Sequence, residues 1–344
     1  MRWTGPAHSS PRIDTSDGTR PPRQGVWTTT GRTSLVRVAT SRGKIETIRT
    51  RVRVAAGITD GRDGYRWNRL AHPQRGSDWF LHKVRATIEG LRFRQAFDHV
   101  EKYCFFVGYQ RSGHSLIGSL LNAHPDIVIA HELGAIPYIE HGFTRDQLFS
   151  ALLRRDRDFA SLGRKWTGYE YAVANQHQGS FHHLRVIGDK FGGITAVQLA
   201  ARPELLDGLR RTVGVPLRVL HVTRNPFDNI TTLSHRMHTS IAQAASRYAQ
   251  LSRSVNIVME MLKPGELLNV DYDAFVAAPS SGLTEICRFL EVEVDPSYLR
   301  DCSAVVWPRT RRTRDSAEWS MDDVAAVQSL LDTYPTLRHY SFDD

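Results

Sequence analysis

One glycine-rich stretch of the chain, VGYQRSGHSLI, joins an apolar run to an amphipathic segment. Against the phosphate-loop pattern G-x-x-x-x-G-K-[ST], Gly108, Gly113 and Ser115 match, but His114 stands at the lysine position. Arg111 places a positive charge inside the loop instead. A strand, a glycine turn and a helix N-terminus present backbone N–H groups to an anion. The stretch therefore predicts an anion site that lacks the lysine serving a nucleotide γ-phosphate.

A second stretch, RVLHVTRNPFDNITT, places an arginine at the end of an apolar strand. Arg224 is followed by Pro226, which the first turn of a helix tolerates, and by Thr232 eight residues on. Arg236 shares the helical face of Thr232. A guanidinium and a hydroxyl together suit a phosphate, because the guanidinium binds two oxygens and the hydroxyl a third. The alternative is that Arg224 pairs structurally with Asp228.

Strands and helices alternate around these two stretches. Strands are expected at 103–108, 126–130, 184–187, 217–222 and 267–270, and helices at 115–122, 194–201, 240–262, 283–290 and 321–333. Several strand candidates are continuous apolar runs, which is typical of strands buried on both faces of a parallel sheet. The pattern predicts an α/β fold, a three-layer, P-loop-like sandwich with a central, mostly parallel sheet. Its ligand would bind at the carboxyl ends of the strands.

The first third of the chain differs in composition from the rest. The 344 residues carry a net charge of +9, yet residues 1–100 hold 19 Lys and Arg against 8 Asp and Glu. Residues 1–75 are rich in Arg, Thr, Ser, Gly and Pro and show no lasting periodicity, so we expect a basic, disordered extension. Apolar residues at helical spacing from Trp79 to Phe97 predict a leading helix within 76–102, before a domain at 103–344. Because the basic excess lies outside that domain, no nucleic-acid partner is expected.

Other partners and settings are limited by what the sequence lacks. No run of about eighteen apolar residues predicts a membrane span, and the start of the chain has no apolar segment typical of a secretory signal. The three cysteines, Cys104, Cys287 and Cys302, are too scattered for a disulfide framework or a zinc site. We therefore expect a cytoplasmic protein without a metal. The oligomeric state is not predictable from the sequence.

Together the two motifs resemble those of the sulfotransferases that use 3′-phosphoadenosine 5′-phosphosulfate (PAPS). The arrangement of RSG, then LNAHPD, then Glu132 looks most like the carbohydrate and protein-tyrosine branches of that family. The resemblance covers residues 103–340. It implies that the first loop holds the 5′-phosphosulfate and the second motif the 3′-phosphate. Position 114 departs from the family, which usually has threonine or serine there.

The resemblance also implies roles for matched residues. Glu132 would be the catalytic base, and Lys190 would stabilise charge in the transition state together with Arg111. The alternatives are a solvated Glu132 and a Lys190 that pairs with Asp189 or another acid. The residues that would bind the donor are Arg111, Ser112, Gly113, His114, Ser115, Arg224, Thr232, Arg236, Tyr272 and, from a late basic loop that would fold over the nucleotide, Arg311, Arg312 and Arg314.

The function implied is metal-independent, in-line transfer of a sulfuryl group from PAPS to a hydroxyl, or an amine, of a small-molecule, glycan or peptide acceptor. Two alternatives remain: a non-catalytic module that binds adenosine bisphosphate, and a small-molecule kinase with a degenerate phosphate loop. His131 is the fallback base, and His131 and His141 are candidates for supporting the acceptor. The acceptor pocket is expected from residues 133–159 and 166–183, whose aromatic content favours a ring-bearing substrate.

Overall fold

The computed structural model describes residues 76–166 and 168–344, so the expected extension at 1–75 lies outside the described residues. The boundaries at 75 and 102 remain predictions. The elements are α2 Gly76–Asp98, β1 Lys102–Gly108, α3 His114–Leu121, β2 Ile127–His131, α4 Ala135–Glu140, α5 Arg145–Ser161, β3 Lys165–Trp166, β4 Tyr169–Glu170, β5 Val186–Lys190, α6 Gly192–Ala201, α7 Glu204–Val213, β6 Leu217–Thr223, α8 Pro226–Met237, α9 Ile241–Glu260, β7 Leu267–Asp271, α10 Tyr272–Ala277, α11 Pro279–Leu290, α12 Pro296–Ala304, η1 Thr313–Ser316 and α13 Met321–Thr333.

Five strands form the central sheet in the order β2-β5-β1-β6-β7. All its pairings are parallel. All five strands were predicted, within a few residues. The largest difference is in β5, which continues through Asp189 and Lys190, although their charges end the apolar run on which the prediction rested. Both residues are buried, so this strand carries charge into the protein interior.

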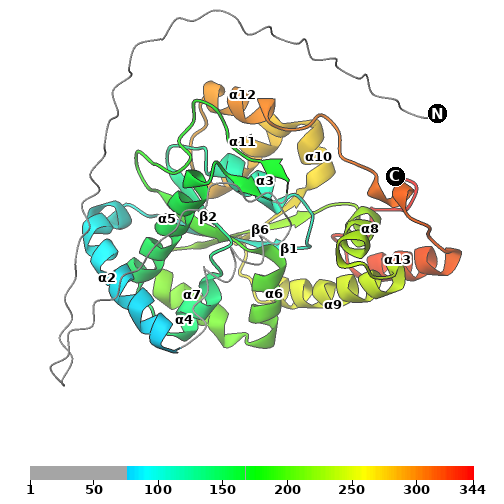
Figure 1. Ribbon diagram of the computed structural model, residues 1–344, viewed down its shortest axis with the longest axis horizontal. Helices are drawn as coiled ribbons and strands as arrows, with labels where there is room; N and C mark the ends of the chain where they lie inside the picture. The colour runs from blue at the N-terminus through cyan, green and yellow to red at the C-terminus, as the bar shows by residue number, and fades with distance from the viewer. Residues whose placement is uncertain (1–75, 167) are drawn as a thin grey trace, which may run out of the picture. The chain divides into compact units, whose positions relative to one another are not determined.

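The two faces of the sheet are each covered by helices, which confirms the three-layer prediction. Along β1, which is buried throughout, Tyr103, Phe105 and Val107 enter one apolar cluster, and Cys104 and Phe106 enter the other. Side chains alternate between the faces of a strand, so β1 is the centre of both clusters. Figure 1 shows α3, α10, α11 and α12 over one face and α6, α7 and α9 over the other, with α13 against α9 at the right.

Most of the expected helices are present, and several others were not predicted. Helices α3, α6, α9, α11 and α13 match the expected ranges, whereas α4, α5, α7, α12 and the small β3–β4 hairpin were not foreseen. The leading helix exists as α2, but most of the apolar residues whose spacing predicted it face solvent rather than the core. Within the described ranges, no helix is long and apolar enough to cross a membrane.

Candidate functional site

The carboxyl ends of the five parallel strands meet at one edge of the sheet, where a cavity of about 630 Å³ opens. Each strand is followed by candidate site residues, because parallel strands deliver what comes after them to the same edge. The candidates that line the cavity are Arg111, Gly113, His114, Ser115, Glu132, Lys190, Arg224, Thr232, Arg236, Tyr272 and Arg311. The structure thus brings together residues that are up to 200 positions apart in the chain.

The glycine loop between β1 and α3 is shaped by close backbone contacts. At Gly108 an added Cβ would lie 2.7 Å from the Val222 carbonyl oxygen, and at Gly113 it would lie 2.0 Å from the Tyr272 ring. Both glycines have positive φ, and so does Arg111 (φ 71°), a conformation uncommon outside glycine. The loop therefore packs against the ends of β6 and β7 and presents Arg111 to the cavity.

His114 is turned back towards the sheet. Its Nε2 lies 3.3 Å from the Val107 carbonyl oxygen, and since a carbonyl only accepts, Nε2 must carry the proton. Burial, reinforced by Lys190, lowers the pKa of His114 to about 3. The ring is therefore neutral at physiological pH and is engaged by the backbone. If the cavity holds an anion, His114 would contribute its backbone N–H at the start of α3 rather than a charge.

Lys190 and Glu132 lie at the ends of the neighbouring strands β5 and β2 and form an ion pair. Lys190 Nζ is 2.8 Å from Glu132 Oε1 and donates to the Ser115 hydroxyl at 2.9 Å. The lysine is only 4% exposed, and this burial lowers its pKa while Glu132 opposes the shift. Lys190 thus pairs with an acid, as the alternative expected, but the acid is the candidate base and not Asp189. The pair joins the anion loop to Glu132.

The backbone of Glu132 is held in a left-handed conformation, with φ 57°. This conformation costs about 1–3 kcal/mol for a residue other than glycine and needs support from its surroundings. The Asp189 carboxylate accepts the N–H groups of Leu133, Gly134 and Ala135 at 2.8–3.1 Å. On the other side, Arg155 donates to the Glu132 carbonyl oxygen at 3.1 Å. We call Asp189 and Arg155 the turn clamp, because together they fix the turn that carries Glu132.

Burial dominates the titration of the turn clamp. It raises the pKa of Asp189 to about 6, although the three backbone N–H groups favour the carboxylate. It lowers the pKa of Arg155 to about 10, against the attraction of Glu132 and Asp189. Two charged groups are therefore kept inside the protein behind Glu132, where each is hydrogen-bonded to the backbone.

Three arginines gather on the other side of the cavity. Burial, the nearby Arg236 and, less strongly, Arg224 lower the pKa of Arg111. Arg224 lies 3.8 Å from Asp228, the contact expected of the structural alternative, but it also lines the cavity. Among residues 76–166 and 168–344, neither Arg111 nor Arg236 has a carboxylate within ion-pair distance. This arginine cluster, Arg111, Arg224 and Arg236, is a concentration of positive charge that an anion would neutralise.

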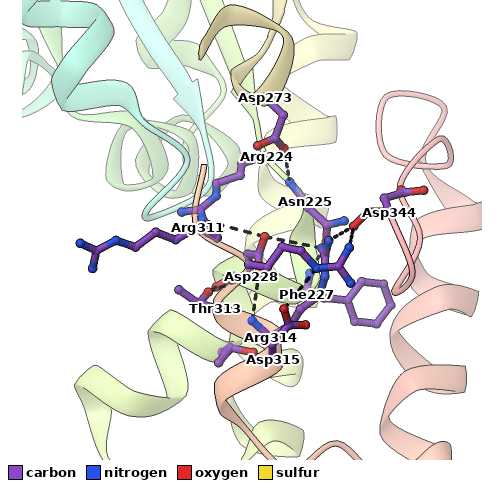
Figure 2. Close-up of polar contacts among 12 residues, drawn as sticks. Arg224, Asn225, Phe227, Asp228, Asp273, Arg311, Thr313, Arg314, Asp315 and Asp344 are labelled. Atoms are coloured by element: carbon purple, nitrogen blue, oxygen red, sulfur yellow. Dashed lines mark hydrogen bonds and ion pairs between the residues drawn. The ribbon is translucent and has the colours of Figure 1, made fainter. Parts of the chain in front are cut away.

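Asp228 holds the basic loop, residues 307–316, part of which lines the cavity, and Figure 2 shows its contacts with Thr313 and Arg314. Its buried carboxylate accepts the backbone N–H of Arg314 at 2.9 Å and pairs with the Arg314 guanidinium at 3.5 Å. The Thr313 hydroxyl donates to the Asp228 carbonyl oxygen at 2.9 Å and lies 3.1 Å from the Thr232 hydroxyl. Arg224 also donates to the Arg311 carbonyl oxygen. The start of α8 therefore holds the loop directly.

Three candidate donor-binding side chains do not line the cavity. Ser112 is fully buried, and its hydroxyl accepts from Asn229 Nδ2 at 2.9 Å. Arg312 and Arg314 border a separate hollow and donate to the carbonyl oxygen of Asp344. In this arrangement Arg312 and Arg314 connect the basic loop to Asp344. Of Arg311, Arg312 and Arg314, only Arg311 lines the cavity.

The wall beyond Glu132 and Lys190 is largely aromatic and comes from the hairpin and from the start of α6. Its members include Trp166, Tyr169, Tyr171 and Phe191. No residue of 133–159 lines the cavity, contrary to expectation, because α5 packs against α2 and β2 instead.

The two histidines considered for acceptor binding or as a fallback base also lie away from the cavity. His131 stacks on Phe159 with ring centroids 4.0 Å apart, and burial lowers its pKa well below the usual value. His141 stacks on Trp79 with ring centroids 3.9 Å apart.

Sequence reasoning missed the residues that support the site. Asp189 entered only as an alternative partner of Lys190, and Arg155 and Asn229 were not singled out. A charged residue that ends an apolar strand is a usable signal for Asp189. Arg155 lies in a run of charged residues, RRDRD, where nothing local marks the one arginine that turns inward.

Comparison with models of protein families identifies one family, and several solved structures are similar to the chain. The sequence model of the sulfotransferase family matches residues 104–296. The sulfotransferase domain of the olefin synthase from Synechococcus PCC 7002 is 18% identical, with 69% of this chain and 96% of that chain covered and a TM-score of 0.42. The sulfotransferase STF1 from Mycobacterium tuberculosis H37Rv is 14% identical, with 73% and 81% covered and a TM-score of 0.41. Mouse sulfotransferase SULT7A1, complexed with PAP, is 13% identical, with 66% and 72% covered and a TM-score of 0.35. No curated protein matches the chain significantly.

Proposed function

The chain belongs to the sulfotransferase family, whose model matches more than half of it, and we propose that it transfers a sulfuryl group from PAPS to an acceptor hydroxyl. The observation that carries the proposal is the pairing of two unlike features in one cavity. Arg111 and Arg236 provide positive charge with no carboxylate partner in the described part of the chain, and Glu132 provides a carboxylate beside Lys190. A donor with two anionic groups, the 5′-phosphosulfate and the 3′-phosphate, and a hydroxyl that must lose a proton require both features.

The donor would lie across the ends of β1, β6 and β7. The backbone N–H groups at the start of α3, with Arg111, would bind the 5′-phosphosulfate. Arg224, Thr232 and Arg236 would bind the 3′-phosphate, with Arg311 above them. Tyr272, which packs on Gly113, would contact the adenine side of the donor.

The transfer itself would occur between the donor loop and Glu132. The acceptor oxygen attacks sulfur as the bond from sulfur to the bridging 5′-phosphate oxygen breaks, leaving adenosine 3′,5′-bisphosphate. Glu132 would take the acceptor proton, since a carboxylate within hydrogen-bond reach is a suitable base. Lys190, held between Glu132 and Ser115, would stabilise the charge that develops on the transferring oxygens. No step requires a metal.

The acceptor would enter along the aromatic wall, which favours a ring-bearing small molecule, glycan or peptide with a free hydroxyl. Trp166 and Phe191 offer flat apolar surface for such a ring. The three cysteines, all in the described part of the chain, are free and buried, which suits a reducing, cytoplasmic setting.

Ligand-dependent thermal stabilisation tests the donor class. Adenosine 3′,5′-bisphosphate should raise the melting temperature, and ATP with magnesium should do so much less. Stabilisation by ATP–magnesium alone would favour the kinase alternative and overturn the proposal. Stabilisation by the bisphosphate, without sulfuryl transfer to any of a broad panel of phenols, sugars and tyrosine peptides, would favour a non-catalytic binding module.

A further inference from the structure

Helix α2 carries a second apolar stripe on the side away from the core. Its members are Phe80, Leu81, Val84, Ile88 and Leu91, which are 68, 62, 42, 66 and 70% exposed. At 100° per residue they fall within about 100° of the helix circumference. Single exposed apolar residues are ordinary, but five on one helix face form a patch of the kind that marks an interaction surface.

The opposite side of α2 is firmly attached to the domain. Ala86 and Phe97 are fully buried, and Glu89 pairs with Arg154 of α5 at 2.6 Å. Figure 1 shows α2 on the periphery beside α5. Since both sides of the helix are apolar and only one is covered, the stripe is a feature of the surface.

The charges beside the stripe indicate what would cover it. Arg85 and Arg92 follow one edge and Arg94 the other, and all three are exposed. An apolar stripe flanked by arginines is typical of a helix that lies in the plane of a membrane surface, with its apolar face among the acyl chains and its cations near anionic headgroups.

The same charges disfavour other occupants. In a second copy, the same face would place its arginines against these arginines; of the acids nearby, Glu89 is already shared between Arg85 at 2.9 Å and Arg154 at 2.6 Å, and Asp98 lies at the helix end. Residues 1–75 carry 15 Lys and Arg against 5 Asp and Glu, so their charge has the same sign as the flanks. Only a negatively charged partner complements the whole surface.

We propose that α2 docks this protein onto an anionic lipid surface through Phe80, Leu81, Val84, Ile88 and Leu91. The helix lies on the membrane and does not span it. The proposal is independent of the catalytic assignment, because none of these residues lines the cavity.

Vesicle sedimentation with the full chain tests this docking, using phosphatidylcholine vesicles with and without about one-third phosphatidylglycerol. Because the basic residues 1–75 would also attract anionic vesicles, the decisive comparison is between Ile88→Glu and Met321→Glu. Met321, at the start of α13, is 89% exposed, so the two variants add the same charge to exposed apolar sites. Ile88→Glu should weaken binding to the anionic vesicles at least tenfold relative to Met321→Glu, since about 1.4 kcal/mol corresponds to tenfold and burial of one isoleucine supplies that much.

Three results would overturn the proposal. The first is no binding of the unmodified chain to anionic vesicles, as expected if residues 1–75 cover the stripe. The second is equal binding by the two variants, which would assign vesicle binding to electrostatic attraction elsewhere. The third is a dimer in sedimentation velocity that Ile88→Glu converts to a monomer, which would make a second copy the occupant. Unchanged thermal unfolding of both variants relative to the unmodified chain verifies that they are folded.

Discussion

Charged side chains are paired on one side of the cavity, and positive charge is in excess on the other. At the ends of β2 and β5, Lys190 and Glu132 neutralise each other, and the turn clamp satisfies the backbone behind them. On the other side, Arg111 and Arg224 follow β1 and β6, and Arg236 lies on α8 nearby; Arg111 and Arg236 have no carboxylate of their own in the described residues. In the proposed mechanism the first side, already assembled in the free protein, would serve proton transfer and charge stabilisation. On the second side the arginines repel one another, so an anionic ligand would neutralise their charge.

Replacing Glu132 tests the first side most severely. Glu132→Gln should lower kcat by about 100- to 10,000-fold, because the proton acceptor is lost while the shape is kept. Stabilisation by adenosine 3′,5′-bisphosphate should remain, because the nucleotide would bind on the other side. Glu170→Gln is the matched control, since Glu170 also lines the cavity but pairs with Lys165 at 3.7 Å. Normal turnover by Glu132→Gln would remove Glu132 from the mechanism.

The turn clamp makes the first side sensitive to pH through Asp189. Its folded pKa of about 6 lies above its ordinary value of 3.8, so the folded state binds the proton more tightly than the unfolded state. The contribution of Asp189 to the free energy of unfolding should therefore fall as pH rises from about 4 to 6 and stay constant above that window. Relative to Asp189→Asn, the free energy of unfolding of the unmodified protein should fall by about 3 kcal/mol across this window, since one pKa unit corresponds to about 1.4 kcal/mol.

Urea unfolding of both proteins at several pH values measures this difference, and taking the difference removes the contributions of other groups, such as His131. A difference that does not change with pH would show that Asp189 titrates normally. A fall in kcat of Asp189→Asn without a change in KM would further assign Asp189 to positioning Glu132.

Removing one arginine should reduce the repulsion within the arginine cluster and weaken the binding of its anionic ligand. Arg236→Ala should leave the stability of the free protein unchanged or higher, because it removes repulsion from Arg111. The affinity for adenosine 3′,5′-bisphosphate should fall about tenfold, as expected for one lost hydrogen bond to a charged group. Calorimetric titration measures this affinity, with Arg253→Ala, an exposed arginine on α9, as the control. A loss of affinity in the control that equals the loss in Arg236→Ala would contradict a specific site.

The sequence predicts the second side better than the first. Strand ends, glycines and hydroxyls at fixed spacing are local signals, so Gly113, Ser115 and Arg224 follow from motifs. The turn clamp depends on Arg155, brought in by a helix that the sequence did not predict, and on Asp189, which the register places opposite Ala130. Helix α2 shows the same limit, because its exposed apolar stripe has the spacing of a core face. Periodicity identifies a helix face but not what covers it.

The smallest effect on donor affinity is expected at His114, where the two sides meet. Its ring donates to Val107 and is neutral, because its folded pKa of about 3 lies below the ordinary 6.5. Its contribution to stability should be present above about pH 6.5 and lost as pH falls towards 3, a dependence that His114→Thr should remove. In His114→Thr the affinity for adenosine 3′,5′-bisphosphate should change less than about threefold (about 0.6 kcal/mol), because the anion would be bound by the backbone N–H that threonine keeps. A loss of affinity of tenfold or more in calorimetric titration would show instead that the imidazole itself binds the donor. Arg111 would then not be the only side chain of the glycine loop that binds the anion.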